Sequence, residues 1–250
     1  MTENFTTQQA KTLRDRETFF KDALASPSLD AQLDALIGDS MLFGYRDKLT
    51  DEQKRYVIAM LTKQITFVNA RAGTGKTTLA VAVAALLDKP MYYVFAPVQE
   101  RTMGYRPGTQ EEKESEYITP LKDALLEIGQ LPEAAILREM TDGYTPSDSA
   151  WVRPMSHVFA RGINLKDCTV IIDEAANLTR GELKKMLTRC HDSCTVIVIG
   201  HTGQNDLPRE STSGFAPYIE HFRNEPYAAV CELTINHRGR LANHADELRW

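Results

Sequence analysis

ITFVNARAGTGKTT, residues 65–78, has the layout of a P-loop: an apolar strand, a glycine-rich turn and the start of a helix. Gly73 and Gly75 allow backbone N–H groups to curl around the phosphates of a nucleotide, and the Lys76 ammonium reaches the same oxygens. The Thr77 hydroxyl can bind Mg²⁺. The stretch therefore predicts a site for ATP and Mg²⁺. The expected nucleotide-binding residues are Ala72, Gly73, Thr74, Gly75, Lys76, Thr77 and Thr78.

The residues around this loop support the interpretation. Residues 79–87 are almost entirely apolar, which predicts a buried helix whose positive N-terminal end faces the phosphates. One position departs from the pattern, because Ala70 stands where the P-loop motif has its first glycine. The strand, loop and helix context is present, and it favours a phosphate site over an ordinary glycine-rich connection.

A second apolar segment, residues 168–174, ends in two carboxylates and is typical of a fully buried parallel strand. Asp173 at the strand end would hold the water shell of Mg²⁺. Glu174 would polarise the water that attacks the γ-phosphate. The alternative is that both carboxylates only begin a loop, and the P-loop upstream favours the catalytic interpretation.

Composition limits the class of protein. The chain has 250 residues and 42% hydrophobic side chains, enough for one large domain or a domain with an appendage. Its net charge of −5 is not that of a basic nucleic-acid-binding domain, although a local groove would suffice. No apolar run approaches the ~20 residues that cross a bilayer, and no export leader is visible. The sequence therefore predicts a cytoplasmic protein that is not associated with a membrane.

The four cysteines do not form a disulfide framework, in keeping with a reducing cytoplasm. Cys190, His191 and Cys194 invite a zinc interpretation, but no second pair is spaced to complete four ligands.

The chain divides into a helical extension, residues 1–48, and an α/β region, residues 49–250. The extension predicts two helices, one from about Gln8 to Ala25 and one that begins after Ser28 and stops at Gly38. Alternating strands and helices then predict a parallel sheet covered by helices on both faces. The expected strands are residues 65–69, 91–96, 168–173, 195–200 and 229–234.

Residues 104–118 contain no clear helix or strand, and long loops inside compact domains are usually functional or mobile. Tyr105 could stack on a base and Arg106 could bind a phosphate. Arg161, just before the strand that ends in Asp173, is a similar candidate. Structural roles remain an alternative for each of the three.

Several short motifs follow the P-loop in order: MGYRPG at 103–108, FARG at 159–162, IDEAANLT at 172–179, LTR at 187–189, QxDLP at 204–208 and SG at 213–214. Together with the P-loop they closely resemble the PhoH family of ATPases, over the region from about residue 49 to the C-terminus. The resemblance implies a RecA-like P-loop core related to superfamily 1 helicases, with some members linked to RNA unwinding or turnover.

The resemblance assigns further roles. Lys76 and Glu174 keep the catalytic roles already argued, and Gln204 corresponds to the helicase residue that senses the γ-phosphate. Gln53 corresponds to an adenine-reading glutamine, but Thr50-Asp51-Glu52-Gln53 is also a capping box, and both interpretations can hold. Arg238, in an Asn-His-Arg run similar to the Asn-aromatic-Arg motif of UvrD-type helicases, would bind the γ-phosphate or form an ordinary salt bridge.

The chain departs from the family pattern at three places. Ala70-Arg71 replaces a usual Gly-Pro, His201 replaces an aspartate, and Asn236 begins a run in which the family has an Arg-His pair. The nucleotide residues are intact, so hydrolysis is still expected.

Only one RecA-like unit is present. The resemblance to superfamily 1 helicases, which place ATP between two such units, implies that a neighbouring subunit supplies the completing arginine, so a homo-oligomer is expected, as a ring or a dimer, with a hexameric ring as the first choice. For Arg238 itself, folding back onto the site of its own chain is the alternative.

The leading functional hypothesis is a Mg²⁺-dependent ATPase that couples hydrolysis to binding, remodelling or unwinding of single-stranded nucleic acid, RNA in preference to DNA. Two alternatives stay open: a P-loop nucleoside kinase, and an ATP-controlled assembly factor with little turnover. A nucleoside kinase would need a substrate-covering segment, often stapled by zinc, that is not visible in the sequence.

Overall fold

The computed structural model describes residues 21, 24–25, 28–96, 117–137, 150–160, 162–207, 209, 212–241 and 244. Most of the predicted helix from Gln8 to Ala25 lies outside these residues, as do Tyr105, Arg106 and Arg161. No helix in the described part of the chain combines the length and the apolar character needed to cross a membrane.

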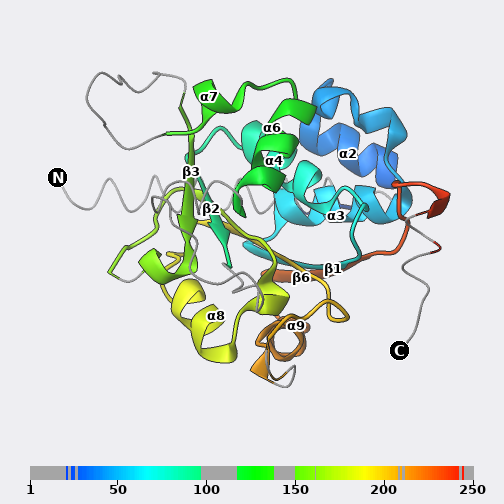
Figure 1. Cartoon of the computed structure of the whole chain (residues 1–250). Coiled ribbons are helices and arrows are strands. Elements are labelled where there is room, and N and C mark those ends of the chain that lie inside the picture. Colours follow the sequence, from blue (N-terminus) through cyan, green and yellow to red (C-terminus); the bar gives the residue numbers. More distant parts are fainter. Residues whose placement is uncertain are drawn as a thin grey trace.

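The described residues form a six-stranded sheet in the order β3-β2-β4-β5-β1-β6, and every neighbouring pair is parallel (Figure 1). All five predicted strands are confirmed to within two residues at each end, and the fold is the predicted α/β P-loop class. The strands are β1 Ile65–Ala70, β2 Met91–Phe95, β3 Val152–Ser156, β4 Thr169–Ile172, β5 Thr195–Gly200 and β6 Ala228–Leu233.

Strand β3 is the one strand among the described residues that the sequence did not reveal. It pairs only with β2 and therefore forms an edge of the sheet. An edge strand needs no continuous apolar run and tolerates proline, and β3 contains both Arg153 and Pro154. Its pattern of burial is accordingly mixed, unlike the fully buried β4.

Helices cover both faces of the sheet, as predicted (Figure 1). Two separate apolar cores result, one on each face. The first face carries α2 Leu29–Ile37, α3 Asp51–Thr62, α4 Lys76–Leu86, α6 Thr119–Glu127 and α7 Pro132–Ala135; the second carries α8 Arg180–Leu187 and α9 Phe215–Phe222. Short 3₁₀ turns lie at η1 Leu42–Gly44, η2 Arg46–Lys48, η3 His157–Ala160 and η4 Ala175–Asn177.

The predicted second helix of the N-terminal extension is confirmed as α2. The Ser28 hydroxyl accepts from the Ala31 N–H at 3.4 Å, and Gly38 ends the helix with a φ of 55°. Leu33 is only 1% exposed and belongs to the same core as α3 and α4. Burial of a side chain of this size stabilises the contact by about 1.5–3 kcal/mol, so α2 is docked on the α/β region.

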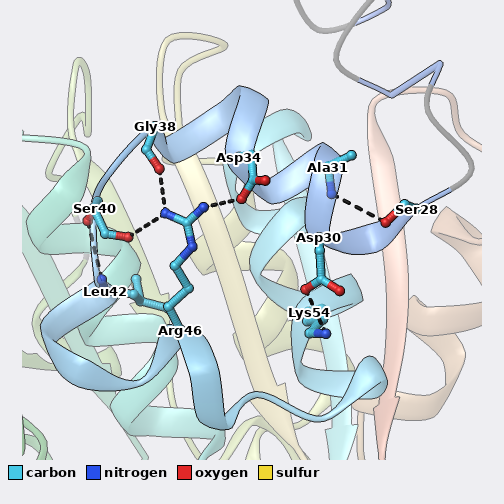
Figure 2. A network of polar contacts seen from close by, with 9 residues as sticks. All are labelled: Ser28, Asp30, Ala31, Asp34, Gly38, Ser40, Leu42, Arg46 and Lys54. Atoms are coloured by element: carbon cyan, nitrogen blue, oxygen red, sulfur yellow. Dashed lines mark hydrogen bonds and ion pairs between the residues drawn. The ribbon is translucent and has the colours of Figure 1, made fainter.

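Polar contacts hold the segment between α2 and α3 in place (Figure 2). The Arg46 guanidinium donates to the backbone carbonyls of Gly38 and Ser40 and pairs with Asp34. Lys54 on α3 pairs with Asp30 on α2 at 2.7 Å. Arg46 thus satisfies the carbonyl of Gly38, the C-cap of α2, and that of Ser40 just beyond it.

Candidate nucleotide-binding site

The P-loop connects the carboxyl end of β1 to the N-terminus of α4, as the sequence predicted. Gly73 and Gly75 have φ values of 76° and 78°, a left-handed backbone that side chains with a Cβ rarely adopt. Gly75 is the N-cap of α4, and Lys76 is its first residue. The loop therefore places the positive end of α4 and the Lys76 side chain at one point.

Three carbonyl groups of this loop are held by hydrogen bonds. The Gly73 carbonyl accepts from the His237 N–H at 2.8 Å, and the Thr74 carbonyl accepts from Gln53 Nε2 at 3.0 Å. The Arg71 carbonyl accepts from the Thr74 hydroxyl at 3.0 Å. Within one planar trans peptide the carbonyl and the next N–H point in opposite directions. The N–H groups that follow these carbonyls therefore point away from the groups that hold them, as an anion site requires.

Asp173 follows β4 and is directly joined to the P-loop. The residue is 2% exposed, and one carboxylate oxygen accepts from the Thr77 hydroxyl at 3.0 Å and from the Tyr93 hydroxyl at 2.6 Å. The Glu174 N–H donates to its other oxygen at 2.8 Å. A buried carboxylate costs several kcal/mol unless hydrogen bonds satisfy it, and these three donors do so. Thr77 and Asp173 are thus brought together as predicted, and their oxygens are the hard ligands that suit Mg²⁺.

Tyr93 is a site residue that sequence reasoning missed. It lies on β2 and is 1% exposed, and its hydroxyl contacts Asp173. Burial, and then the negative charge of Asp173, raise the pKa of Tyr93 well above its usual range, so it stays a hydrogen-bond donor. Tyr93 reaches Asp173 because β2 lies next to β4 in the sheet. The order of strands cannot be read from one sequence, so the pattern of residues alone did not reveal this contact.

Glu174 has a left-handed backbone with a φ of 51°, uncommon for a residue other than glycine. Desolvation, and then the neighbouring Asp173, raise the pKa of its carboxyl, while Lys76 acts in the opposite direction. The residue as a whole is exposed, so this desolvation is only partial. A carboxylate close to Lys76 and open to solvent is suited to orient water and to accept its proton.

A cavity of about 630 Å³ opens beside Asp173 and Glu174, at the carboxyl ends of the parallel strands, where α/β sheets commonly bind ligands. Gln204 lines it together with Glu174, so these two predicted residues share one cavity. The Phe95 and Tyr117 rings are stacked, with centroids 5.8 Å apart and planes 5° from parallel. The full lining is Tyr93, Phe95, Ala96, Tyr117, Pro120, Asp173, Glu174, Asn177, Gly203, Gln204, Asn205 and Asp206.

The chain after β6 crosses the P-loop and brings Arg238 to it. A Cβ added at Gly73 would lie 2.5 Å from Arg238 Cγ and 2.5 Å from Asn236 Oδ1. Only glycine therefore fits at position 73, for its conformation and for this contact. Arg238 thus lies against the P-loop of its own chain, and its role at the γ-phosphate stays a prediction.

Gln53 also reaches the loop, from the first turn of α3. The capping-box interpretation is confirmed, because its side chain accepts from the Thr50 N–H while the Thr50 hydroxyl accepts from the Gln53 N–H. Its Nε2 group is bonded to the Thr74 carbonyl. The adenine-reading role stays a prediction.

The chain resembles proteins of one family. A family model described as PhoH-like protein matches residues 47–245. A PhoH-like protein of Mycobacterium bovis is 34% identical over 199 residues, covering 76% of this chain and 54% of that protein. Protein PhoH of Escherichia coli is 32% identical over 187 residues, covering 72% of this chain and 51% of that protein. The chain spans about half the length of the curated relatives it matches.

Solved structures with a similar arrangement include a Pif1 helicase from Bacteroides in complex with ADP-AlF4. It is 15% identical, with a TM-score of 0.37 over 79% of this chain and 44% of that one. An arterivirus helicase in complex with DNA is 12% identical, with a TM-score of 0.43 over 75% of this chain and 42% of that one.

Proposed function

This chain belongs to the PhoH family, and we propose that it is a Mg²⁺-dependent ATPase that couples hydrolysis to binding, remodelling or unwinding of single-stranded nucleic acid, with RNA preferred over DNA. The observation that carries the ATPase proposal is the 3.0 Å hydrogen bond between Thr77 on the P-loop and Asp173 after β4. It joins the phosphate-binding element to the catalytic carboxylates, and a mere glycine-rich turn would not need such a partner.

In this mechanism each residue has a separate task. Lys76 and the loop N–H groups would bind the β- and γ-phosphates, while Thr77 and Asp173 would hold Mg²⁺, which would offset the phosphate charge. Glu174 orients the attacking water and accepts its proton. Gln204 faces the same cavity and would register whether the γ-phosphate is present. Tyr93 keeps the Asp173 carboxylate in one orientation.

We propose that the cavity beside Glu174 receives an unstacked base. Its stacked Phe95 and Tyr117 rings offer an aromatic wall, and the side-chain amides of Asn177 and Gln204 line the same space. Asp173, Glu174 and Asp206 also line it, and their charges disfavour the backbone phosphates of a nucleic-acid strand inside. Tyr105, Arg106 and Arg161, which lie outside the described residues, stay proposed contacts of the strand.

Replacing Tyr117 tests this cavity. Tyr117→Leu keeps an apolar side chain but removes the ring, and stacking on one base contributes about 1–3 kcal/mol. We therefore expect single-stranded RNA to bind roughly tenfold more weakly in fluorescence anisotropy, with ATP binding retained. Tyr117→Phe keeps the stack and should bind like the wild type. Equal RNA affinity in Tyr117→Leu and Tyr117→Phe would remove the cavity from the proposal.

The location of Arg238 favours action within its own chain, because its side chain packs against Gly73 of the same P-loop. A mixture of two inactive variants, Arg238→Ala and Glu174→Gln, should then stay as inactive as its components in a phosphate-release assay. Partial recovery would contradict the arrangement within one chain. It would place the arginine across an interface and support a homo-oligomer, with the hexameric ring as its simplest closed form.

A further inference from the structure

Two segments contact the P-loop on the side where its carbonyl groups are held. They are the first turn of α3 and residues 234–238 after β6, here called the strap. Apart from the packing of Arg238 against Gly73, none of the contacts that these segments make with the loop or with each other is part of the reaction proposed above. Together they account for two of the three loop carbonyls that are held, those of Gly73 and Thr74.

The Gln53 side-chain amide is fully engaged by these segments. Its Oε1 accepts from the Thr50 N–H at 3.0 Å, and its Nε2 donates to the Thr74 carbonyl at 3.0 Å. Nε2 also lies 3.3 Å from His237 Nε2, a contact that requires the imidazole tautomer with an unprotonated Nε2. Gln53 is 7% exposed, so breaking one of these bonds would leave a buried polar group without a partner.

The strap is fastened at both of its ends. At one end, the Thr234 N–H and hydroxyl donate to the two oxygens of Glu52 at 2.7 and 2.6 Å. The Thr234 hydroxyl, with smaller help from backbone N–H groups, lowers the pKa of Glu52, as expected for a carboxylate that accepts several hydrogen bonds. At the other end, the His237 N–H donates to the Gly73 carbonyl at 2.8 Å.

We propose that Gln53 and the strap form an external brace that holds the P-loop peptides in their phosphate-binding orientation, and that Glu52 and Thr234 form the latch that keeps the strap in place. Gly73 and Gly75 give the loop its left-handed turns but also its conformational freedom. External hydrogen bonds to the carbonyls remove that freedom before a ligand binds, and such preorganisation strengthens binding. Gln53, Glu52 and Thr234 are thus positioning residues for the phosphates.

The brace and adenine reading by Gln53 make different predictions for a ligand without a base. Gln53→Met removes the bond to the Thr74 carbonyl. If Gln53 acts as a brace, ATP and inorganic tripolyphosphate should lose affinity by the same factor, roughly tenfold, in calorimetric titrations with Mg²⁺. Thr50→Ala is the matched control, because it weakens the same helix cap but leaves the Gln53 amide on the loop, and it should bind both ligands normally. If Gln53→Met weakens ATP but not tripolyphosphate, the brace is wrong and the adenine role stands.

The latch provides an independent test, because Glu52 and Thr234 are bonded to each other and not to the loop. Glu52→Gln and Thr234→Val each remove part of the latch, and both should weaken tripolyphosphate several-fold, roughly three- to tenfold. Asp51→Asn removes the same charge as Glu52→Gln from the same turn of α3, but Asp51 has its contact with Lys54 and not with the strap. Loss of a negative charge alone would strengthen phosphate binding. Weaker tripolyphosphate binding in Glu52→Gln and Thr234→Val, but not in Asp51→Asn, therefore identifies the brace. Thermal unfolding of each variant without ligand should stay close to that of the wild type.

This inference rests on the proposed nucleotide site, and the titrations separate the two. Wild-type protein that binds neither ATP nor tripolyphosphate would overturn the proposed function and the brace together. Wild-type protein that binds both, with all latch variants and Gln53→Met unchanged, would overturn the brace alone.

Discussion

Glu174→Gln is expected to bind ATP as tightly as the wild type and to hydrolyse it roughly a hundredfold or more slowly. The amide keeps the size of the side chain but cannot accept a proton from water. Burial raises the pKa of Glu174 and the nearby Asp173 raises it further, so a neutral amide at this position should not impair folding. Phosphate release in single-turnover conditions, together with ATP titration, gives both quantities.

Asp206→Asn is the matched control for Glu174→Gln. Asp206 lines the same cavity and is one of the charges that contribute to the raised pKa of Glu174, but it has no assigned part in the chemistry. Its hydrolysis rate should stay within a few-fold of the wild type. Equal rates in Glu174→Gln and the wild type would remove Glu174 from the catalytic role.

Lys76→Ala is expected to abolish tight ATP binding. Lys76 is the first residue of α4, and its ammonium is the positive side chain that the P-loop motif directs to the β- and γ-phosphates. The N–H groups of the loop remain but lack a full positive charge. Titration with ATP and with tripolyphosphate should show the loss for both ligands, because it concerns the phosphates.

Lys89→Ala provides the comparison, because Lys89 lies beyond the opposite end of α4 and carries the same charge. Normal ATP binding is expected for this variant. Retained tight binding in Lys76→Ala would mean that the loop does not bind phosphates in the way proposed.

Local sequence patterns were enough to predict the parts of the site that follow one another along the chain. The P-loop, the strand ending in Asp173 and the helix from Ser28 to Gly38 each carry their own signal: glycine spacing, an apolar run with terminal carboxylates, and caps. The sheet also followed, since alternating strands and helices favour parallel pairing. These signals are local, and tertiary contacts did not overrule them.

Contacts between distant segments could not be predicted from these patterns. The Tyr93 hydroxyl meets Asp173 because β2 and β4 are neighbours, and the order of strands is not written in any one of them. The bond between Glu52 and Thr234 spans 182 positions in the chain, and Thr234 resembles any polar residue at the end of a strand. The Gln53 capping box was visible in the sequence, but its bond to the Thr74 carbonyl was not.

The most direct test of the account is steady-state phosphate release by the wild-type chain in Mg²⁺, with and without single-stranded RNA and DNA. We predict measurable hydrolysis that stops on chelation of Mg²⁺, is roughly a hundredfold or more slower in Glu174→Gln, and rises with a single strand, more with RNA than with DNA. Wild-type turnover no faster than that of Glu174→Gln, with or without either strand, would contradict the account.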